Sequence, residues 1–218
     1  MSWFTRAMGL YEDIEKGGPR SFKEIEGPDW TSKYMNEVNR SKDFIDEYGF
    51  AVPSRDAIEK IKSFVGNATV LEIGAGRGLW AKLLQDAGIT VVPTDLHSGK
   101  RNTNQQSIVH NTNPYWSKSK NRKTFTDILH MSHEDALKQF GQHNVLMMIW
   151  PPYSCNMAAQ ALKSFKGSKF IFGGEGSGGC TADDEFFDML ENQWQKVDTI
   201  CVPQWEGIHD CVVLYEKK

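Results

Sequence analysis

The sequence lacks any long run of apolar residues. The longest uninterrupted one extends from Val145 to Trp150, far short of the ~20 residues that a membrane-spanning helix needs. The first residues, Met1 to Arg6, contain no basic stretch followed by an apolar one, so they do not resemble a secretory signal. These absences argue against a membrane protein and a secreted protein, and we expect a cytoplasmic protein with no membrane partner.

Cysteine is scarce, and no two cysteines form a C-x-x-C pair. The four cysteines are Cys155, Cys180, Cys201 and Cys211. This spacing does not fit zinc or redox motifs, so we expect reduced cysteines that pack as small apolar side chains. His130, His133 and Asp135 are suitable metal ligands by type, but they span the end of an expected strand and share no clear helical face. We therefore expect no metal.

A strong charge of one sign is also absent. The 218 residues include 25 basic and 28 acidic side chains, for a formal net charge of −3, which excludes a uniformly basic nucleic-acid binder. Residues 96–126, however, contain no acid. Their basic side chains are Lys100, Arg101, Lys118, Lys120, Arg122 and Lys123. A solvated loop and a phosphate-binding segment both fit this pattern, so a nucleic-acid partner stays open.

Strands alternating with helices are expected from residue 51 onward. Short apolar runs predict strands at 69–73, 90–94, 127–131, 145–150, 169–172, 197–202 and 211–215. Helical patterns predict helices at 55–65, from 79 as far as 88, at 132–140, 156–165 and 181–194. This alternation indicates a parallel α/β sheet. The last two strands have no helix between them, so we expect the final strand to be antiparallel.

The first 50 residues differ from the rest of the chain. They are aromatic-rich and helical in pieces, with breaks at Gly17-Gly18-Pro19 and Gly27-Pro28. We expect residues 1–50 to form a helical lid or extension over one side of a cleft, and residues 51–218 to form the main domain. Tyr48 precedes the first helix of that domain, where its ring could contact a cofactor.

The strongest motif is a glycine-rich stretch after the first expected strand, from Val70 to Leu79. Its glycines, Gly74, Gly76 and Gly78, permit a tight turn and the close approach of a ligand. Glu72 precedes them; a carboxylate there is unsuited to a pyrophosphate but can attract a cationic amino group. Asp95 ends the next strand, at a position suited to accepting ribose hydroxyls.

This stretch resembles motif I and the following acidic position of class I S-adenosylmethionine-dependent methyltransferases, and the resemblance covers about residues 50–216. It implies a Rossmann-like seven-stranded, mostly parallel sheet with helices on both faces, and S-adenosylmethionine as the cofactor. The cofactor-binding residues that it implies are Glu72, Gly74, Ala75, Gly76, Gly78, Asp95, Leu96, Glu134, Asp135 and Trp150. For Glu134 and Asp135 an acidic first helical turn is an equal alternative.

A second motif, Trp150-Pro151-Pro152-Tyr153, follows the most apolar strand. It is similar to the Asp/Asn/Ser-Pro-Pro-Tyr/Phe motif of methyltransferases that act on amino nitrogens, but indole cannot accept the hydrogen bond that the first residue of that motif accepts. N6-adenine methylation is therefore disfavoured. Trp150 and Tyr153 are expected to frame an aromatic, cationic or apolar acceptor, or alternatively to be core aromatics.

A third motif is the glycine-rich stretch from Gly173 to Gly179, which surrounds Glu175. It follows a strand at the edge where open α/β sheets bind ligands. Glu175 is therefore a candidate general base or anchor for a substrate amine, and a solvated loop residue is the alternative. His209 and Asp210, before the last strand, are weaker candidates for the acceptor pocket.

The leading hypothesis is a methyltransferase that uses Trp150, Tyr153 and Glu175 on a small-molecule or protein acceptor. A second hypothesis is a catalytically inactive methyltransferase-like fold that binds a protein or nucleic-acid partner. A nicotinamide-dependent oxidoreductase is a third, and the spacing of Gly74, Gly76 and Gly78 disfavours it.

Overall fold

The apolar run that begins at Val145 forms the centre of the sheet. In the computed structural model, which describes residues 3–20, 27, 29–96 and 124–218, strand β4 (Val145–Ile149) is buried along its whole length. It pairs in parallel with β1 (Val70–Ile73) on one side and with β5 (Lys169–Gly174) on the other. A strand covered on both faces needs apolar side chains at every position, which explains the uninterrupted run.

Four further strands complete a seven-stranded sheet. They are β2 (Val91–Asp95), β3 (Leu129–His130), β6 (Trp194–Cys201) and β7 (Cys211–Lys217). The strand order is β3-β2-β1-β4-β5-β7-β6, and β7 runs antiparallel to both β5 and β6. The predicted Rossmann-like sheet, with its antiparallel last strand, is confirmed.

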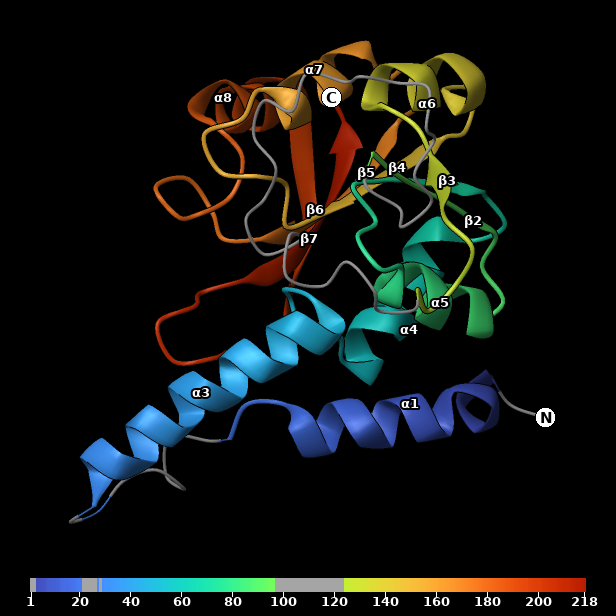
Figure 1. The fold of residues 1–218 in the computed structure, drawn as a ribbon. Helices are drawn as coiled ribbons and strands as arrows, with labels where there is room; N and C mark the ends of the chain where they lie inside the picture. The colour runs from blue at the N-terminus through green and yellow to red at the C-terminus, as the bar shows by residue number, and fades with distance from the viewer. Residues whose placement is uncertain (1–2, 21–26, 28, 97–123) are drawn as a thin grey trace, which may run out of the picture.

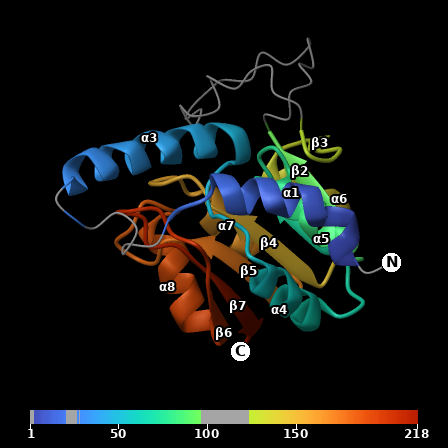
Figure 2. The same cartoon turned by 90° about the horizontal axis from the view of Figure 1, so that it is seen from below.

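Helices cover both faces of this sheet (Figures 1 and 2). One face carries α1 (Trp3–Gly17), α4 (Arg55–Val65) and α5 (Leu79–Asp86), and the other carries α6 (His133–Phe140), α7 (Met157–Ser164) and α8 (Asp184–Gln193). Helix α4 begins where predicted, because the Ser54 hydroxyl accepts a hydrogen bond from the Ala57 amide at 3.2 Å. None of the described helices is long and apolar enough to span a bilayer.

Several boundaries differ from the prediction, for example that of β6, which begins at Trp194 and not at residue 197. Helix α8 begins later than residue 181, because the Asp183 side chain is its N-cap and accepts a hydrogen bond from the Phe186 amide at 3.0 Å. The buried Thr181 hydroxyl instead donates to the Glu175 carbonyl oxygen at 2.6 Å. Strand β3 is shorter than predicted and both its residues are exposed, so it lacks the apolar alternation that would have defined its ends.

The first helices pack on the sheet domain. Tyr11 and Ile14 of α1 and Phe44 of α3 (Trp30–Tyr48) are buried in the same apolar cluster as α4 and α5. Arg40 of α3 joins the two helices, because its guanidinium donates to the Gly18 carbonyl oxygen at 2.8 Å and lies 2.5 Å from the Glu37 carboxylate. Within the basic segment 96–126, residues 97–123 lie outside the described residues.

Candidate functional site

The predicted glycine turn joins β1 to α5. Gly74, Gly76 and Gly78 have φ angles of 75°, 59° and 78°, in the left-handed region that favours glycine. Gly78 has a second constraint, because a Cβ atom there would lie 2.9 Å from Cγ2 of Thr126. This turn requires glycine at its last position for both its conformation and its packing.

The end of β2 holds this turn in place. The Asp95 side chain is buried, and its Oδ2 accepts a hydrogen bond from the Gly76 amide at 2.9 Å. The amides of Gly74 and Ala75 donate to the Thr94 carbonyl oxygen at 2.9 and 3.0 Å. Asp95 therefore lies against the glycine turn, as the sequence predicts, whereas the next residue, Leu96, has 45% of its surface exposed.

Glu72 is a buried acid next to this turn. Only 1% of its surface is exposed, and its Oε2 has no hydrogen-bond partner among the described residues. Burial, together with the negative charge of Asp95, raises the pKa of Glu72 from 4.5 to about 8. A buried carboxyl oxygen without a partner is costly, so this position calls for a ligand that brings a hydrogen-bond donor or a positive charge.

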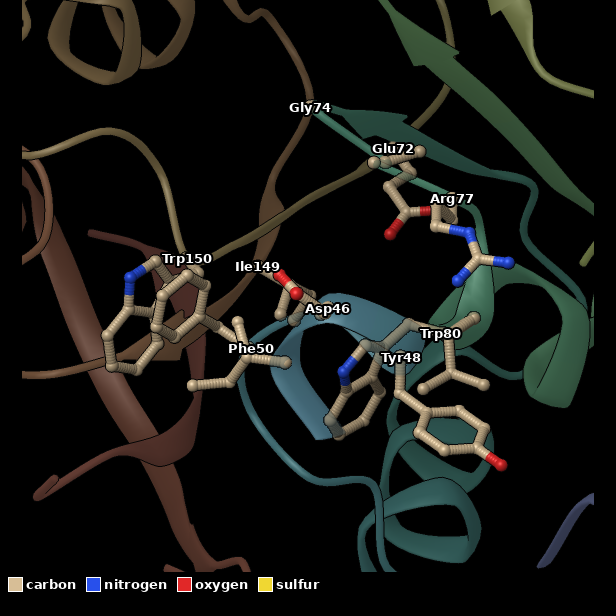
Figure 3. A pocket seen from close by; sticks show the side chains of 14 residues that line it. Asp46, Tyr48, Phe50, Glu72, Gly74, Arg77, Trp80, Ile149 and Trp150 are labelled. Carbon is tan, nitrogen blue, oxygen red and sulfur yellow. The ribbon is translucent and has the colours of Figure 1, made fainter. Parts of the chain in front are cut away.

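A pocket opens beside Glu72, between the glycine turn and the chain that follows α3 (Figure 3). Side chains of very different kinds line it, among them Asp46, Phe50, Glu72, Arg77, Trp80 and Trp150. The predicted residues Gly74, Ala75 and Gly76 also line it, as does Tyr48. The structure thus brings together most of the glycine turn, Trp150 and the end of α3.

Two stacked aromatic rings form one wall of the pocket. The rings of Trp150 and Phe50 lie 4.6 Å apart between centroids at an interplanar angle of 11°. Trp150 has a φ of 53°, unusual for a bulky residue, and its amide donates to the Gly173 carbonyl oxygen at 2.6 Å. The end of β4 thus turns so that the indole ring faces Phe50.

The opposite side of the pocket ties the end of α3 to the glycine turn. The Arg77 guanidinium donates to the Glu47 carbonyl oxygen and lies 3.6 Å from the Glu47 carboxylate. It also lies over the Phe125 ring, 5.0 Å from the centroid. The Trp80 indole nitrogen donates to the Ala51 carbonyl oxygen at 3.0 Å. These contacts fix the chain that covers the pocket.

The other predicted acceptor residues lie apart from this pocket. Tyr153 has 66% of its surface exposed. The buried Glu175 carboxylate accepts hydrogen bonds from the amides of Cys180, at 2.8 Å, and His209, at 2.9 Å, so it joins the β5–α8 loop to the β6–β7 loop. Acceptor roles for Tyr153 and Glu175 stay predictions.

Asp210 is a second buried acid near Glu175. Its Oδ1 has no hydrogen-bond partner among the described residues. Burial, and the charge of Glu175 to a lesser degree, raise the pKa of Asp210 from 3.8 to about 6, against opposing effects of its own backbone amide and of His209. The carboxyl group therefore holds its proton more tightly than an exposed aspartate does.

Glu134 and Asp135 lie in the first turn of α6, where the Asp135 amide donates to the Ser132 hydroxyl at 3.1 Å. Neither residue lines the pocket, and contact with an adenine stays a prediction. His133 lies 3.2 Å from the Glu134 carboxylate. Across the described residues, no three His, Cys, Asp or Glu side chains are grouped so that they could hold a metal ion.

Several pocket residues were not singled out from the sequence, among them Asp46, Arg77 and Trp80. Asp46 lies in the last turn of α3, and nothing local to that helix indicates that its end lies beside β1. Arg77 and Trp80 follow glycines of the turn, so their positions could have suggested a contact with the pocket.

The fold and the site together define a Rossmann-like α/β protein with a ligand pocket at the carboxyl edge of its sheet, where open α/β sheets bind their ligands. Solved structures similar to this chain include S-adenosylmethionine-dependent methyltransferases. No protein-family profile matches the sequence. No curated protein matches it either.

Three of these structures show the range of sequence identity and structural similarity. The 1,6-didemethyltoxoflavin N1-methyltransferase of Burkholderia thailandensis, which holds 1,6-didemethyltoxoflavin and S-adenosylhomocysteine, is 15% identical with a TM-score of 0.48, over 87% of this chain and 85% of that one. A TehB-like methyltransferase from Corynebacterium glutamicum is 14% identical with a TM-score of 0.47, over 86% and 100%. The magnesium protoporphyrin IX methyltransferase of Synechocystis, with bound S-adenosylmethionine, is 9% identical with a TM-score of 0.46, over 84% and 97%.

Proposed function

We propose that this chain is an S-adenosylmethionine-dependent methyltransferase that acts on a small-molecule or protein acceptor. The observation that carries the proposal is the buried carboxyl group of Glu72, which has an unpartnered oxygen next to the pocket. The amino group of S-adenosylmethionine supplies the hydrogen-bond donor and the positive charge that this oxygen lacks. The ribose hydroxyls would be held by Asp95, at the end of β2.

The charge of the pocket distinguishes this cofactor from a dinucleotide. Glu72 and Asp46 both line the pocket, and neither carboxyl group offers a favourable contact to the pyrophosphate of a nicotinamide cofactor. A carboxylate in place of phosphate-binding groups thus favours a cationic ligand.

The chemistry makes modest demands on the protein. When bound, S-adenosylmethionine supplies a methyl group on a positively charged sulfur. A lone pair of the acceptor attacks the methyl carbon, and the sulfur is the leaving group. The contribution of this chain is to hold the cofactor along Glu72 and the glycine turn, to exclude water with the stacked rings of Trp150 and Phe50, and to orient the acceptor.

Isothermal titration calorimetry tests the proposal directly. The folded protein should bind S-adenosylmethionine and S-adenosylhomocysteine, and Glu72→Gln should weaken the binding of both by at least about tenfold, because the substitution removes a carboxyl group that can give up its proton and pair with the amino group. Gln substitution of the exposed Glu191 is the matched control. A folded wild-type protein that binds neither compound would rule the function out.

A further inference from the structure

The pocket contains more acidic than basic side chains. Asp46, from the end of α3, and Glu72, from β1, both contribute carboxyl groups to its lining (Figure 3). Among the described lining residues only Arg77 is positively charged, and its guanidinium is engaged by the carbonyl oxygen and the carboxylate of Glu47. The local charges therefore favour a cation in this space.

The aromatic lining has the same preference. Phe50 and Trp150 stack on each other, and both line the pocket together with Asp46. The faces of aromatic rings attract cations, so these rings and the carboxylates favour the same kind of ligand. Asp46, in the last turn of α3, and Phe50, just after the helix, come from one short stretch of chain, whereas Glu72 belongs to the sheet.

The two carboxyl groups do not have equivalent tasks. Glu72 is fully buried beside the glycine turn, and under the proposed function it meets the amino group, which the methyl donor and its demethylated product share. Glu72 therefore cannot tell the two apart. Asp46 is only half-buried and lies on the covering side of the pocket.

We propose, on the basis of the proposed function, that Asp46 is a specificity-determining residue: it makes the pocket prefer the positively charged methyl donor to its neutral product. In the transfer, the carbon–sulfur bond breaks and its electron pair stays on sulfur, while the acceptor's lone pair forms the new bond to the methyl carbon. The sulfur loses its positive charge, and any proton on the acceptor passes to water. The attraction to Asp46 then disappears, which favours release of the product.

Calorimetry with three ligands tests this proposal. The probes are S-adenosylmethionine, S-adenosylhomocysteine, and sinefungin, in which a protonated amine replaces the methylated sulfur. Asp46→Asn should weaken the binding of S-adenosylmethionine and sinefungin by about three- to tenfold. The affinity for S-adenosylhomocysteine should stay within about twofold of the wild-type value. High salt should reduce the preference of the wild type for the two cationic ligands.

Two variants serve as controls. Asp43→Asn makes the same change in net charge at an exposed position of the same helix and should leave all three affinities unchanged. Asp46→Glu should retain the preference for cationic ligands, and thermal melts establish that each variant is folded. If Asp46→Asn changed the affinity for all three ligands equally, or changed none of them, the role of Asp46 would be overturned. The proposed function would not be affected by that result. Failure of the wild type to bind any of the three would overturn both.

Discussion

The Asp95 carboxylate lies 2.9 Å from the Gly76 amide nitrogen and accepts its hydrogen bond. The acid proposed to hold a ribose therefore also supports the turn that would lie along the rest of the cofactor. Because one side chain serves both purposes, a substitution at Asp95 changes the shape of the turn as well as its contacts with a ligand.

Two substitutions of Asp95 separate these effects. Asp95→Ala removes the acceptor of the Gly76 amide, and we expect it to lower the free energy of unfolding by about 1–3 kcal/mol. Asp95→Asn keeps an oxygen that can accept the same bond, so this variant should lose less stability than Asp95→Ala. It should still bind S-adenosylhomocysteine more weakly than the wild type does. Urea denaturation and calorimetry measure the two quantities. Equal stability losses in the two variants would contradict the supporting role.

Gly78→Ala should destabilise the protein through both strain and overlap. The position has a φ of 78°, and an added Cβ would lie 2.9 Å from Thr126 and 3.2 Å from Ile128. The left-handed conformation costs about 1–2 kcal/mol, and overpacking adds about 1–3 kcal/mol. Gly207→Ala, at the same φ of 78° with open space around it, isolates the first cost. Denaturation midpoints compare the two; a loss at Gly78 no larger than at Gly207 would be inconsistent with the overlap.

Glu175→Gln distinguishes a loop clamp from a general base. The carboxylate accepts two amide hydrogen bonds, from Cys180 and His209, and bonds to a charged acceptor are the stronger kind. We expect the variant to lose about 1–3 kcal/mol of stability and to bind S-adenosylhomocysteine normally. Urea denaturation provides the measurement, with Glu191→Gln as the exposed control. Unchanged stability would argue for a role in the reaction instead.

Asp210 should make stability depend on pH. Its native pKa of about 6 lies above the ordinary 3.8, so the folded state binds more protons between these values and stability falls as pH rises through this window. Asp210→Asn should remove this dependence. The stability of the variant relative to the wild type should therefore rise as the pH increases from about 4 to about 7. Thermal melts across that range test it, with the exposed Asp127→Asn as control. Parallel curves for variant and wild type would contradict the expectation.

The sequence predicted the parts of the fold that depend on local chemistry. The Ser54 N-cap places the start of α4, and the run from Val145 identifies the strand that is buried on both faces. The glycines between Glu72 and Leu79 indicate the turn because their left-handed backbone is a local requirement. Each of these signals lies within a few residues of the structure that it predicts.

Features that depend on distant contacts could not be predicted in this way. The position of Asp46 in the pocket follows from how the end of α3 lies against the glycine turn, which no periodicity within α3 indicates. Thr181 looked like a helix cap but bonds to the Glu175 carbonyl oxygen, because the β5–α8 loop folds back on itself. Glu175 itself is engaged by the His209 amide, which follows a different strand.

The Arg40 contacts have a consequence for the pocket at the far end of the same helix. Arg40 binds carbonyl oxygens at the end of α1 and lies over the Trp205 ring, 5.8 Å from its centroid, while Asp46 lies in the last turns of α3. These contacts hold the middle of α3 against the end of α1 and against the β6–β7 loop. The placement of the helix end that lines the pocket therefore depends on contacts made outside the pocket.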